Sequence, residues 1–362
     1  MATKLFLNLL RRKGVSSRKR KNGGFTVIEL LISMLIASIV ITVLLNLMID
    51  LLQTDRREYA RTETQREMQM AMDFIVNDLR EAVYVYDNAR LNQQTNDVPP
   101  LKNFIPERSG YEPILAFWKP EPIDDDSQLP NNCSGAPSNP PSEEWTKCRN
   151  LWVKRRIMTL VVYYQTKNEG ADREKWKGIS RIMRYTLRQY DISGSTRIDV
   201  NAENPAYVEP LTTQGVEFSI WPFARVSTSG LVSRQRERPS DIPANSPVLV
   251  DFLDHPVANR PDGFRPVPTD PRLQCPTNYT AIPPQNNPSN FSLPSFAVCV
   301  SRATPRDAGG GGGANTTSNQ NQDVIVFLRG NPTGKAGVKI APLLAIRTQA
   351  VARGVVDKTP VD

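Results

Sequence analysis

KNGGFTVIE, residues 21–29, joins a basic leader to a long apolar segment and places one carboxylate inside that segment. Between residues 25 and 45, Glu29 is the only charged side chain. As a helix rising about 1.5 Å per residue, this run is about 30 Å long, which matches the hydrocarbon core of a bilayer. A carboxylate at that depth costs a few kcal/mol unless a cation pairs with it. The pattern therefore predicts a membrane helix in which Glu29 has a functional partner.

The same residues resemble the class III signal of type IV prepilins and pseudopilins. That signal is a basic leader ending in Gly, cleavage before Phe, and Glu at the fifth mature position, which here are Gly24, Phe25 and Glu29. The resemblance implies that prepilin peptidase cuts between Gly24 and Phe25 and methylates the new amino group of Phe25. It also implies subunit assembly through Glu29, which would pair with the Phe25 ammonium of a neighbouring chain, so that two costly charges compensate each other.

Two other interpretations of the N-terminus are weighed. An ordinary signal peptide has small residues and a cleavage site after its apolar run, whereas here Asn46, Leu47, Met48, Ile49 and Asp50 follow. The stronger alternative is an uncleaved, signal-anchored extracytoplasmic protein whose head binds a glycan or a peptide. The mature N-terminus distinguishes this alternative from the pilin interpretation.

Charge along the chain indicates its orientation. The formal net charge is +8, and residues 1–24 contain eight Lys and Arg side chains and no acid, so the chain after Gly24 is near neutral. Basic residues beside an apolar helix stay cytoplasmic. We therefore expect a single-pass protein of the inner membrane with a cytoplasmic N-terminus and an extracytoplasmic head, and we predict no nucleic-acid partner.

All four cysteines follow the apolar segment, as expected for an oxidising compartment. Four cysteines allow three pairings. We favour Cys133 with Cys148 and Cys275 with Cys299, because each bond closes a short loop rich in Pro, Asn and Ser and contributes about 3 kcal/mol. A zinc site made of the four thiolates is the alternative, but no C-x-x-C spacing is present.

The chain divides into four predicted parts. These are a leader at 1–24, a transmembrane helix at 25–49, an amphipathic extension of that helix at 50–88, and a β-rich head at 89–362. The extension carries an apolar stripe at spacings of three and four, formed by Met68, Met72, Ile75, Leu79 and Val83. We expect the helix to continue unbroken to about Tyr86 and to lay this stripe on a sheet.

A second resemblance concerns residues 72–82, which look like the matching helix of minor pilins and pseudopilins of the PilW or pseudopilin J type. Asp78 and Arg80 within this segment are interpreted as solvated side chains. The whole pattern is also similar to the cyanobacterial hormogonium polysaccharide secretion pseudopilins. These resemblances imply a type IV pilin-like α+β fold, in which a long N-terminal helix packs on an antiparallel sheet with long loops. They imply a non-catalytic subunit without cofactor, whose partners are prepilin peptidase, major and minor pilins, an inner-membrane assembly platform and membrane lipid.

Six strands are predicted in the head from β-branched and aromatic runs, at 159–166, 179–190, 216–223, 247–253, 296–302 and 324–329. The first two form a hairpin, and alternation in the second predicts one wet and one buried face, with Ile182, Arg184, Thr186 and Arg188 on the wet side and Met183, Tyr185 and Leu187 on the buried side. Pro-rich tracts at 119–141 and 239–294 and a Gly-rich segment at 309–322 are assigned to surface loops.

No enzyme is predicted. His255 is the single histidine, so neither a histidine metal pair nor a Ser-His-Asp arrangement is indicated. The acidic run Asp124, Asp125, Asp126 is read as a solvated loop rather than a Ca²⁺ site, because three adjacent side chains cannot all face one ion. The tryptophans at 118, 145, 152 and 176 are assigned to packing, with a sugar or partner surface as the alternative.

Overall fold

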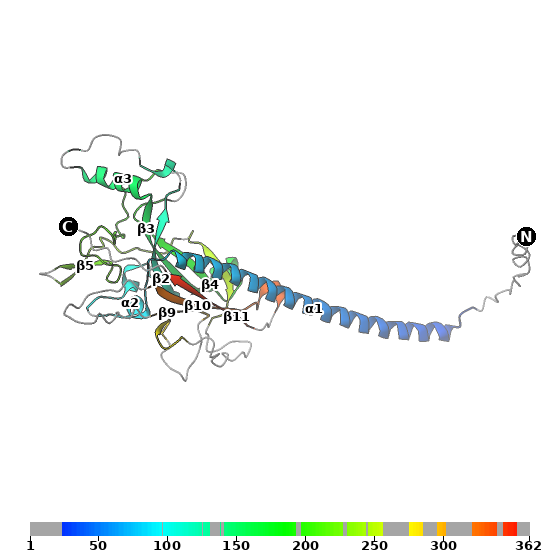
Figure 1. The fold of residues 1–362 in the computed structure, drawn as a ribbon. Coiled ribbons are helices and arrows are strands. Elements are labelled where there is room, and N and C mark those ends of the chain that lie inside the picture. Colours follow the sequence, from blue (N-terminus) through cyan, green and yellow to red (C-terminus); the bar gives the residue numbers. More distant parts are fainter. Residues whose placement is uncertain are drawn as a thin grey trace, which may run out of the picture. The chain divides into compact units, whose positions relative to one another are not determined.

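The computed structural model describes residues 24–95, 97–124, 126–130, 138, 141–192, 197–226, 230–243, 245–255, 275–284, 295–301, 321–338 and 343–352. The chain divides into two compact units, Met1–Asp55 and Arg56–Asp362. The longest element, helix α1 (Val27–Arg80), begins in the first unit and ends in the second (Figure 1). It continues through Asn46 without a break.

The head contains eleven described strands. They are β1 (Tyr84–Val85), β2 (Tyr111–Pro122), β3 (Arg156–Lys167), β4 (Ser180–Leu187), β5 (Phe223–Val226), β6 (Gly230–Ser233), β7 (Val248–Leu253), β8 (Tyr279–Ile282), β9 (Phe296–Ser301), β10 (Gln322–Gly330) and β11 (Leu344–Ala352). Nine form one antiparallel sheet in the order β1-β2-β3-β4-β7-β10-β9-β8, and β11 pairs with β10; β5 and β6 form a separate hairpin. The predicted α+β class, a long helix on an antiparallel sheet, is confirmed.

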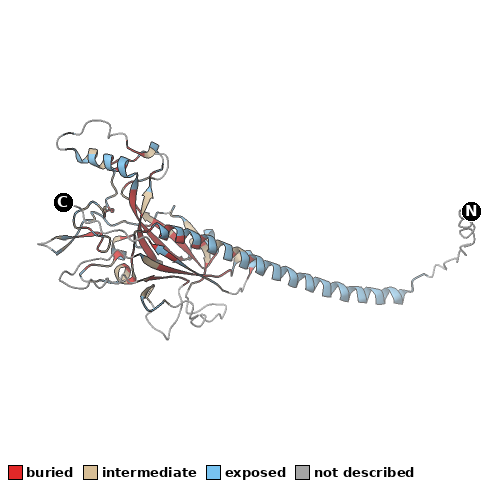
Figure 2. Ribbon diagram, viewed as in Figure 1, coloured by how far each residue is buried: buried red, intermediate tan, exposed pale blue. Residues whose placement is uncertain are grey.

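The second half of α1 covers one face of the sheet through the predicted stripe. Met68, Met72, Ile75 and Leu79 are buried in the main core, and Val83 packs against it beyond the end of the helix. Figure 2 shows the buried sheet as red strands. Gly330 of β10 provides the closest approach, because a Cβ at this position would lie 2.2 Å from Met68 Sδ. The absence of a side chain at Gly330 therefore lets Met68 reach the backbone of β10.

The opposite face of the sheet is covered by irregular chain. Trp118 of β2 is fully buried, and its ring centroid lies 5.4 Å from that of Trp221 and 5.9 Å from that of Tyr207. Both faces of β3 are therefore buried, and all but its first and last residues are inaccessible. A strand buried on both faces has a nearly continuous apolar sequence, as in residues 157–164, which are interrupted by Thr159 alone.

This arrangement corrects the predicted wet face of β4. Met183, Tyr185 and Leu187 are buried as expected, and β4 pairs with β3 as the predicted hairpin. Ile182, however, is fully buried, and Arg184 forms an ion pair beneath α1 instead of facing water. The alternation is real, but its polar side is the face that the helix covers.

Five of the six predicted strands correspond to β3, β4, β7, β9 and β10. The prediction for 216–223 is wrong: residues 217–222 form no strand, Val216 makes one isolated bridge to Ala224, and Phe223 is the first residue of β5. The assignment of 119–141 to a loop is also wrong at its start, because β2 continues to Pro122 and Ile123 is buried. Strands β1, β2, β5, β6, β8 and β11 were not predicted.

The helix ends earlier than the expected position near Tyr86. Beyond Arg80 the backbone turns, and Tyr84 and Val85 pair with Trp118 and Phe117 of β2 as strand β1. The free edge of β1 is closed by the Gln322 side chain, which accepts from Val85 N at 2.8 Å and donates to Val85 O at 2.9 Å. The backbone N–H and C=O of Val85, on the edge of β1 away from β2, are therefore both hydrogen-bonded.

Short helices occupy the connections: α2 (Asn88–Asn92), α3 (Glu143–Lys154), α4 (Asp172–Lys175), and the 3₁₀ turns η1 (Leu101–Phe104), η2 (Asp126–Gln128) and η4 (Lys335–Gly337). In α3, Ser142 accepts a hydrogen bond from Trp145 N, which is an N-cap. Residues 309–320 of the predicted Gly-rich loop lie outside the described residues, as does much of the tract at 239–294.

Candidate processing and assembly site

The predicted cleavage position lies immediately before α1. Gly24 and Phe25 are exposed and precede the first helical residue, and Phe25 retains 76% of its accessible surface. A Cβ at Gly24 would meet no atom within 4 Å. Nothing within the described chain therefore obstructs the peptide bond between Gly24 and Phe25, and the glycine is not required by packing here.

Glu29 lies in the first turn of α1. Thr26 caps the helix, because its Oγ1 accepts a hydrogen bond from Glu29 N at 3.3 Å and its carbonyl accepts one from Leu30 N at 3.2 Å. Thr26 and Glu29 have the spacing of a capping box, and an acid in the first turn also interacts favourably with the helix dipole. Glu29 is exposed and forms no ion pair within the described chain. Its carboxylate thus projects from a well-defined helical position.

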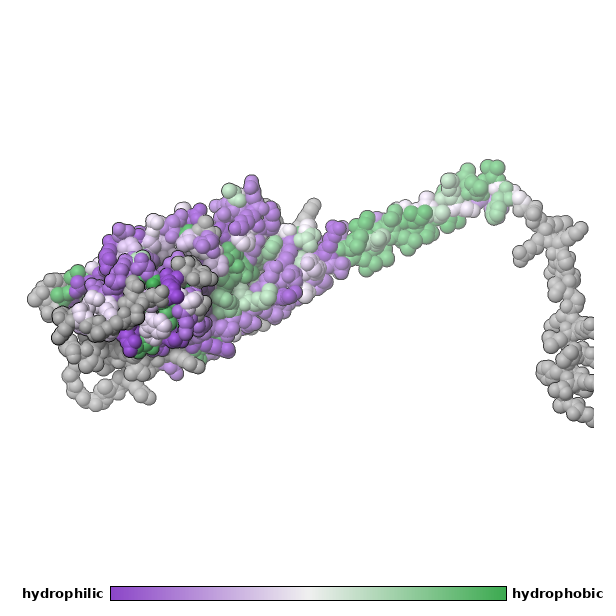
Figure 3. Space-filling view, turned by 90° about the horizontal axis from the view of Figure 1, so that it is seen from above, coloured by the Kyte–Doolittle hydropathy of each residue, from purple (hydrophilic) through white to green (hydrophobic). Residues whose placement is uncertain are grey.

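The first half of α1 exposes its apolar side chains. Every residue from 27 to 52 is exposed, including the leucines, isoleucines and valines that make up most of it. Figure 3 shows this part of the helix as a largely hydrophobic surface with a few paler patches. Its most apolar 18-residue window has a mean hydropathy of 2.7 and no buried residue, which makes α1 the one described helix long and apolar enough to cross a membrane. Such a surface requires lipid or other apolar helices around it.

The second half of α1 is fixed to the sheet by a buried ionic network around Asp78. Lys119 Nζ lies 2.8 Å from Asp78 Oδ1, and Arg184 Nε lies 2.8 Å from Asp78 Oδ2. Tyr163 donates its hydroxyl to the same Oδ2 at 2.7 Å, while Lys119 also contacts Glu81 at 2.6 Å. Asp78 is only 6% exposed, so its interpretation as a solvated residue is wrong.

The charges of this network compensate each other. Burial by itself would raise the pKa of Asp78, but Arg184, Lys119 and Tyr163 hold that pKa below its ordinary value. Asp78 is therefore ionised and provides the counter-charge for the two cations. Sequence reasoning missed this role because the partners come from β2, β3 and β4, far along the chain.

A second contact to the helix comes from the connection between β10 and β11. Lys335 Nζ lies 2.6 Å from Glu67 Oε1 and 4.8 Å from the ring centroid of Phe252. Val338 packs on Ala60. This part of α1 is thus held by one ion pair, from Glu67 to Lys335, and one apolar contact, between Ala60 and Val338.

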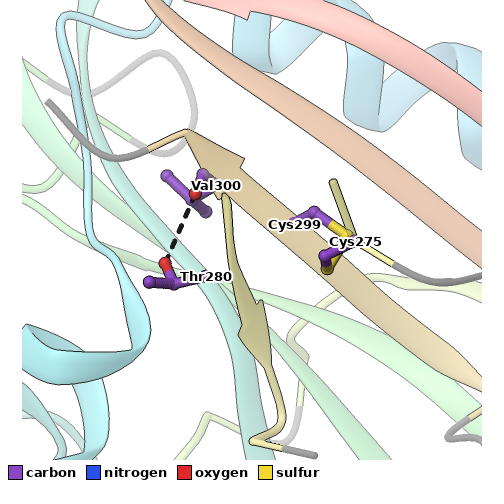
Figure 4. The surroundings of a disulfide bond; sticks show 4 residues. All are labelled: Cys275, Thr280, Cys299 and Val300. Atoms are coloured by element: carbon purple, nitrogen blue, oxygen red, sulfur yellow. Dashed lines mark hydrogen bonds between the residues drawn. A yellow bond between two sulfur atoms is a disulfide. The ribbon is translucent and has the colours of Figure 1, made fainter. Parts of the chain in front are cut away.

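The structure contains the predicted disulfide between Cys275 and Cys299, whose Cα atoms are 5.5 Å apart (Figure 4). Cys299 lies on β9, and the β8 residue Thr280 donates its hydroxyl to Val300 O at 3.3 Å. The bond therefore fixes the chain that precedes β8 to the sheet itself. Cys148 is buried in α3, and Cys133 lies outside the described residues, so the pairing of these two remains a prediction.

The other candidate residues make contacts that belong to the fold of the head. Trp118 belongs to the core, while Trp152 of α3 donates Nε1 to Pro130 O at 2.8 Å. Asp126 pairs with Arg155 at 2.9 Å, and Asp125 lies outside the described residues. His255 follows β7, and burial lowers its pKa. Across the described segments, no three His, Cys, Asp or Glu side chains gather as a metal site.

Comparison with known proteins bears on the N-terminus. Residues 19–45 match the prokaryotic N-terminal methylation motif, which includes Gly24, Phe25 and Glu29. No curated protein and no solved structure shows significant similarity to the chain. The chain thus has a type IV prepilin-like N-terminus and an apolar helix joined to a pilin-like α+β head. The motif implies a membrane-anchored precursor that is a substrate of prepilin peptidase.

Proposed function

We propose that this chain is a minor pilin or pseudopilin that initiates or tips a type IV pilus-like or secretion filament. Prepilin peptidase cuts between Gly24 and Phe25 and methylates Phe25, and the mature subunit then leaves the membrane for the filament. The observation that carries the proposal is the coincidence of the methylation motif at 19–45 with the first half of α1, residues 27–52, whose apolar side chains are all exposed. The precursor would lie in the inner membrane with its N-terminus cytoplasmic and its head extracytoplasmic, and the mature subunit in the filament or at the cell surface.

The exposed half of α1 supports both stages of this function. As a precursor, the helix is covered by lipid, and in a filament it is covered by the helices of major and minor pilins. The inner-membrane assembly platform would move it from one environment to the other. In the filament, Glu29 pairs with the methylated Phe25 ammonium of a neighbour, which fixes the axial register of the two helices more than it adds stability.

The size of the head supports a minor rather than a repeating subunit. The predicted head, residues 89–362, makes up about three-quarters of the chain, and this bulk is unsuited to close repetition in a thin fibre. The resemblance of residues 72–82 to minor pilins and pseudopilins of the PilW or pseudopilin J type supports the same assignment. Hormogonium polysaccharide secretion is one system that such a subunit would serve.

The test is incorporation of a Glu29→Val variant into filaments. This residue has no partner in the described part of the head, so the variant should be processed and folded normally yet be absent from sheared filaments. Ser33→Val, one turn further along the exposed helix, serves as the matched control and should be incorporated. Normal incorporation of Glu29→Val would contradict the assembly role, and a chain never found in filaments would favour the uncleaved, anchored binding protein.

A further inference from the structure

The irregular layer over the sheet contains one buried carboxyl group with an unusual set of partners. Glu209 Oε2 lies 2.9 Å from Tyr207 Oη, and Glu209 Oε1 accepts a hydrogen bond from Leu211 N at 3.2 Å. Tyr207 Oη also lies 2.7 Å from the carbonyl oxygen of Met158 on β3. These contacts join residues 207–211 to the sheet through a single tyrosine hydroxyl.

Counting hydrogens assigns a proton to this group. A tyrosine hydroxyl has one hydrogen, and a backbone carbonyl can only accept. A separation of 2.7 Å between Tyr207 Oη and Met158 O requires that hydrogen to point at Met158. Glu209 can then interact favourably with Tyr207 only as a donor, so Oε2 must be protonated.

The strand register explains why Met158 takes the hydrogen. Ala116 O and Trp118 O of β2 accept hydrogen bonds from Tyr86 N and Val83 N, so alternate residues of β2, including Pro120, direct their backbone polar groups away from β3. Met158 is opposite Pro120, so its carbonyl faces away from β2, and the pairing of β3 with β4 ends at Leu160, before it reaches Met158. The Tyr207 hydroxyl therefore supplies a donor to a carbonyl that lies beyond the end of the pairing with β4. A buried carbonyl without a partner would cost about 1–3 kcal/mol.

The surroundings of Glu209 favour its neutral form. Burial raises the pKa of Glu209 above its ordinary value of 4.5, and this effect exceeds the lowering influences of the contacts with Tyr207 and Leu211 N and of the exposed Lys154 side chain at the end of α3. The other titratable groups facing this site are Tyr207 itself and Tyr190, whose hydroxyl contacts Glu203 at 3.3 Å. No ion pair to Glu209 occurs among the described residues.

We propose that Glu209 is a pH-sensitive latch, which holds residues 205–211 on β3 when it is protonated and releases them when it loses its proton. Ionisation removes the hydrogen from Glu209 Oε2. The resulting negative charge then lies against Tyr207 Oη, whose own hydrogen points at Met158 O. Either that contact or the bond to Met158 is then lost. The latch therefore tightens as the pH falls below the raised pKa of Glu209 and loosens as the pH rises above it.

The released segment is part of the aromatic cover of the sheet. Tyr207 packs edge-on against Trp118, and Trp221 donates Nε1 to Val208 O at 2.8 Å. Opening therefore exposes the rings of Trp118 and Trp221, which are otherwise buried. This inference stands independently of the role of the N-terminus, because every group in it belongs to the head.

Hydrogen exchange measured by mass spectrometry on the full chain in detergent tests the latch. Exchange is measured from about pH 4 to about pH 9 and corrected for intrinsic exchange, with β3 as the internal reference. Protection of residues 205–211 should be highest at the acidic end and should fall by up to about tenfold per pH unit once the pH exceeds the pKa of Glu209. Glu209→Gln keeps a donor toward Tyr207 and an acceptor for Leu211 at every pH, so its protection should not vary. Glu217→Gln, an exposed acid of the same layer, should behave as wild type.

Constant protection of 205–211 in the wild type across this range would overturn the proposal. So would a Glu209→Gln variant that keeps the pH dependence of the wild type. The wild-type measurement decides the matter even if the variant does not fold.

Discussion

Asp78 on the last turns of α1 and Arg184 on β4 form a buried ion pair, with 2.8 Å between Asp78 Oδ2 and Arg184 Nε. The two residues are 106 positions apart in the chain. Lys119 and Tyr163 complete the partners of the carboxylate, so one acid joins the helix to β2, β3 and β4. The orientation of α1 on the head therefore depends on a small set of charges as well as on apolar packing.

Removing the acid should be strongly destabilising. Asp78→Ala leaves Lys119 with only Glu81 and Arg184 without its partner, and breaking a buried pair in this way costs about 3–5 kcal/mol. Denaturant unfolding of the purified full chain measures the loss. Asp73→Ala, on the exposed side of the same helix, should change stability by less than about 0.5 kcal/mol. Equal effects of the two variants would contradict the network.

Acid should weaken the same contact. Asp78 and Glu121 both have a pKa below the ordinary value despite burial, held there for Glu121 mainly by Arg188. Each contributes stability that is present above the unfolded-state pKa, near 4, and is lost as pH falls through the folded-state pKa. The melting temperature should therefore drop below about pH 4, and Asp78→Asn should show a smaller drop. A wild-type melting temperature that is flat in this range would be inconsistent with ionised partners.

How far the sequence predicts the fold depends on the range of the interactions. The Met68 to Leu79 stripe and strands β3, β4, β7, β9 and β10 follow from local periodicity, and each was recognised. Strand β2 contains three prolines, Pro113, Pro120 and Pro122, which disfavour strand structure, and its last four residues belong to the tract that the sequence assigns to a loop. A register shift between Pro113 and Leu115 accommodates the first of these, and Pro120 and Pro122 still pair with β3 at the end of the strand.

The candidate site divides in the same way. Gly24, Phe25 and Glu29 are local in sequence, and the methylation motif covers all three. The burial of Asp78 could not be predicted, because an acid at that position is solvated or buried according to partners on distant strands. Strand β11, with alternation from Leu344 to Ala352, did contain a recognisable signal in its period of two.

The Cys275–Cys299 disulfide should stabilise the sheet edge rather than the loops alone. It closes a segment with a sequence separation of 24, and its loss in Cys275→Ser/Cys299→Ser should cost about 3 kcal/mol. Because Cys299 lies on β9, exchange protection should fall first in β8 and β9 and remain in β3. Non-reducing peptide mapping of the wild type checks the bond and also tests the predicted partner of Cys148. A crosslink from Cys275 to Cys133 would contradict both pairings.

Any side chain at position 330 should clash with Met68 unless the Met68 side chain moves. Gly330→Ala places a methyl group 2.2 Å from Met68 Sδ and 3.1 Å from Thr64 Cγ2, and overpacking of this kind costs about 1–3 kcal/mol. A double-mutant cycle with Met68→Ala should give a coupling energy of about 0.5 kcal/mol or more, because the smaller side chain leaves room for the methyl group. Strict additivity of the two substitutions would show that the helix does not approach β10 this closely.

The mature N-terminus tests the central claim most directly. Mass spectrometry of the N-terminal peptide from membrane-extracted protein should find a chain that begins at N-methylated Phe25, with residues 1–24 absent. In a Gly24→Val variant, the leader should remain attached while the protein still inserts into the membrane. An intact leader in the wild type, or a normally shortened product from Gly24→Val, would contradict the assignment of this chain as a processed pilin-type subunit.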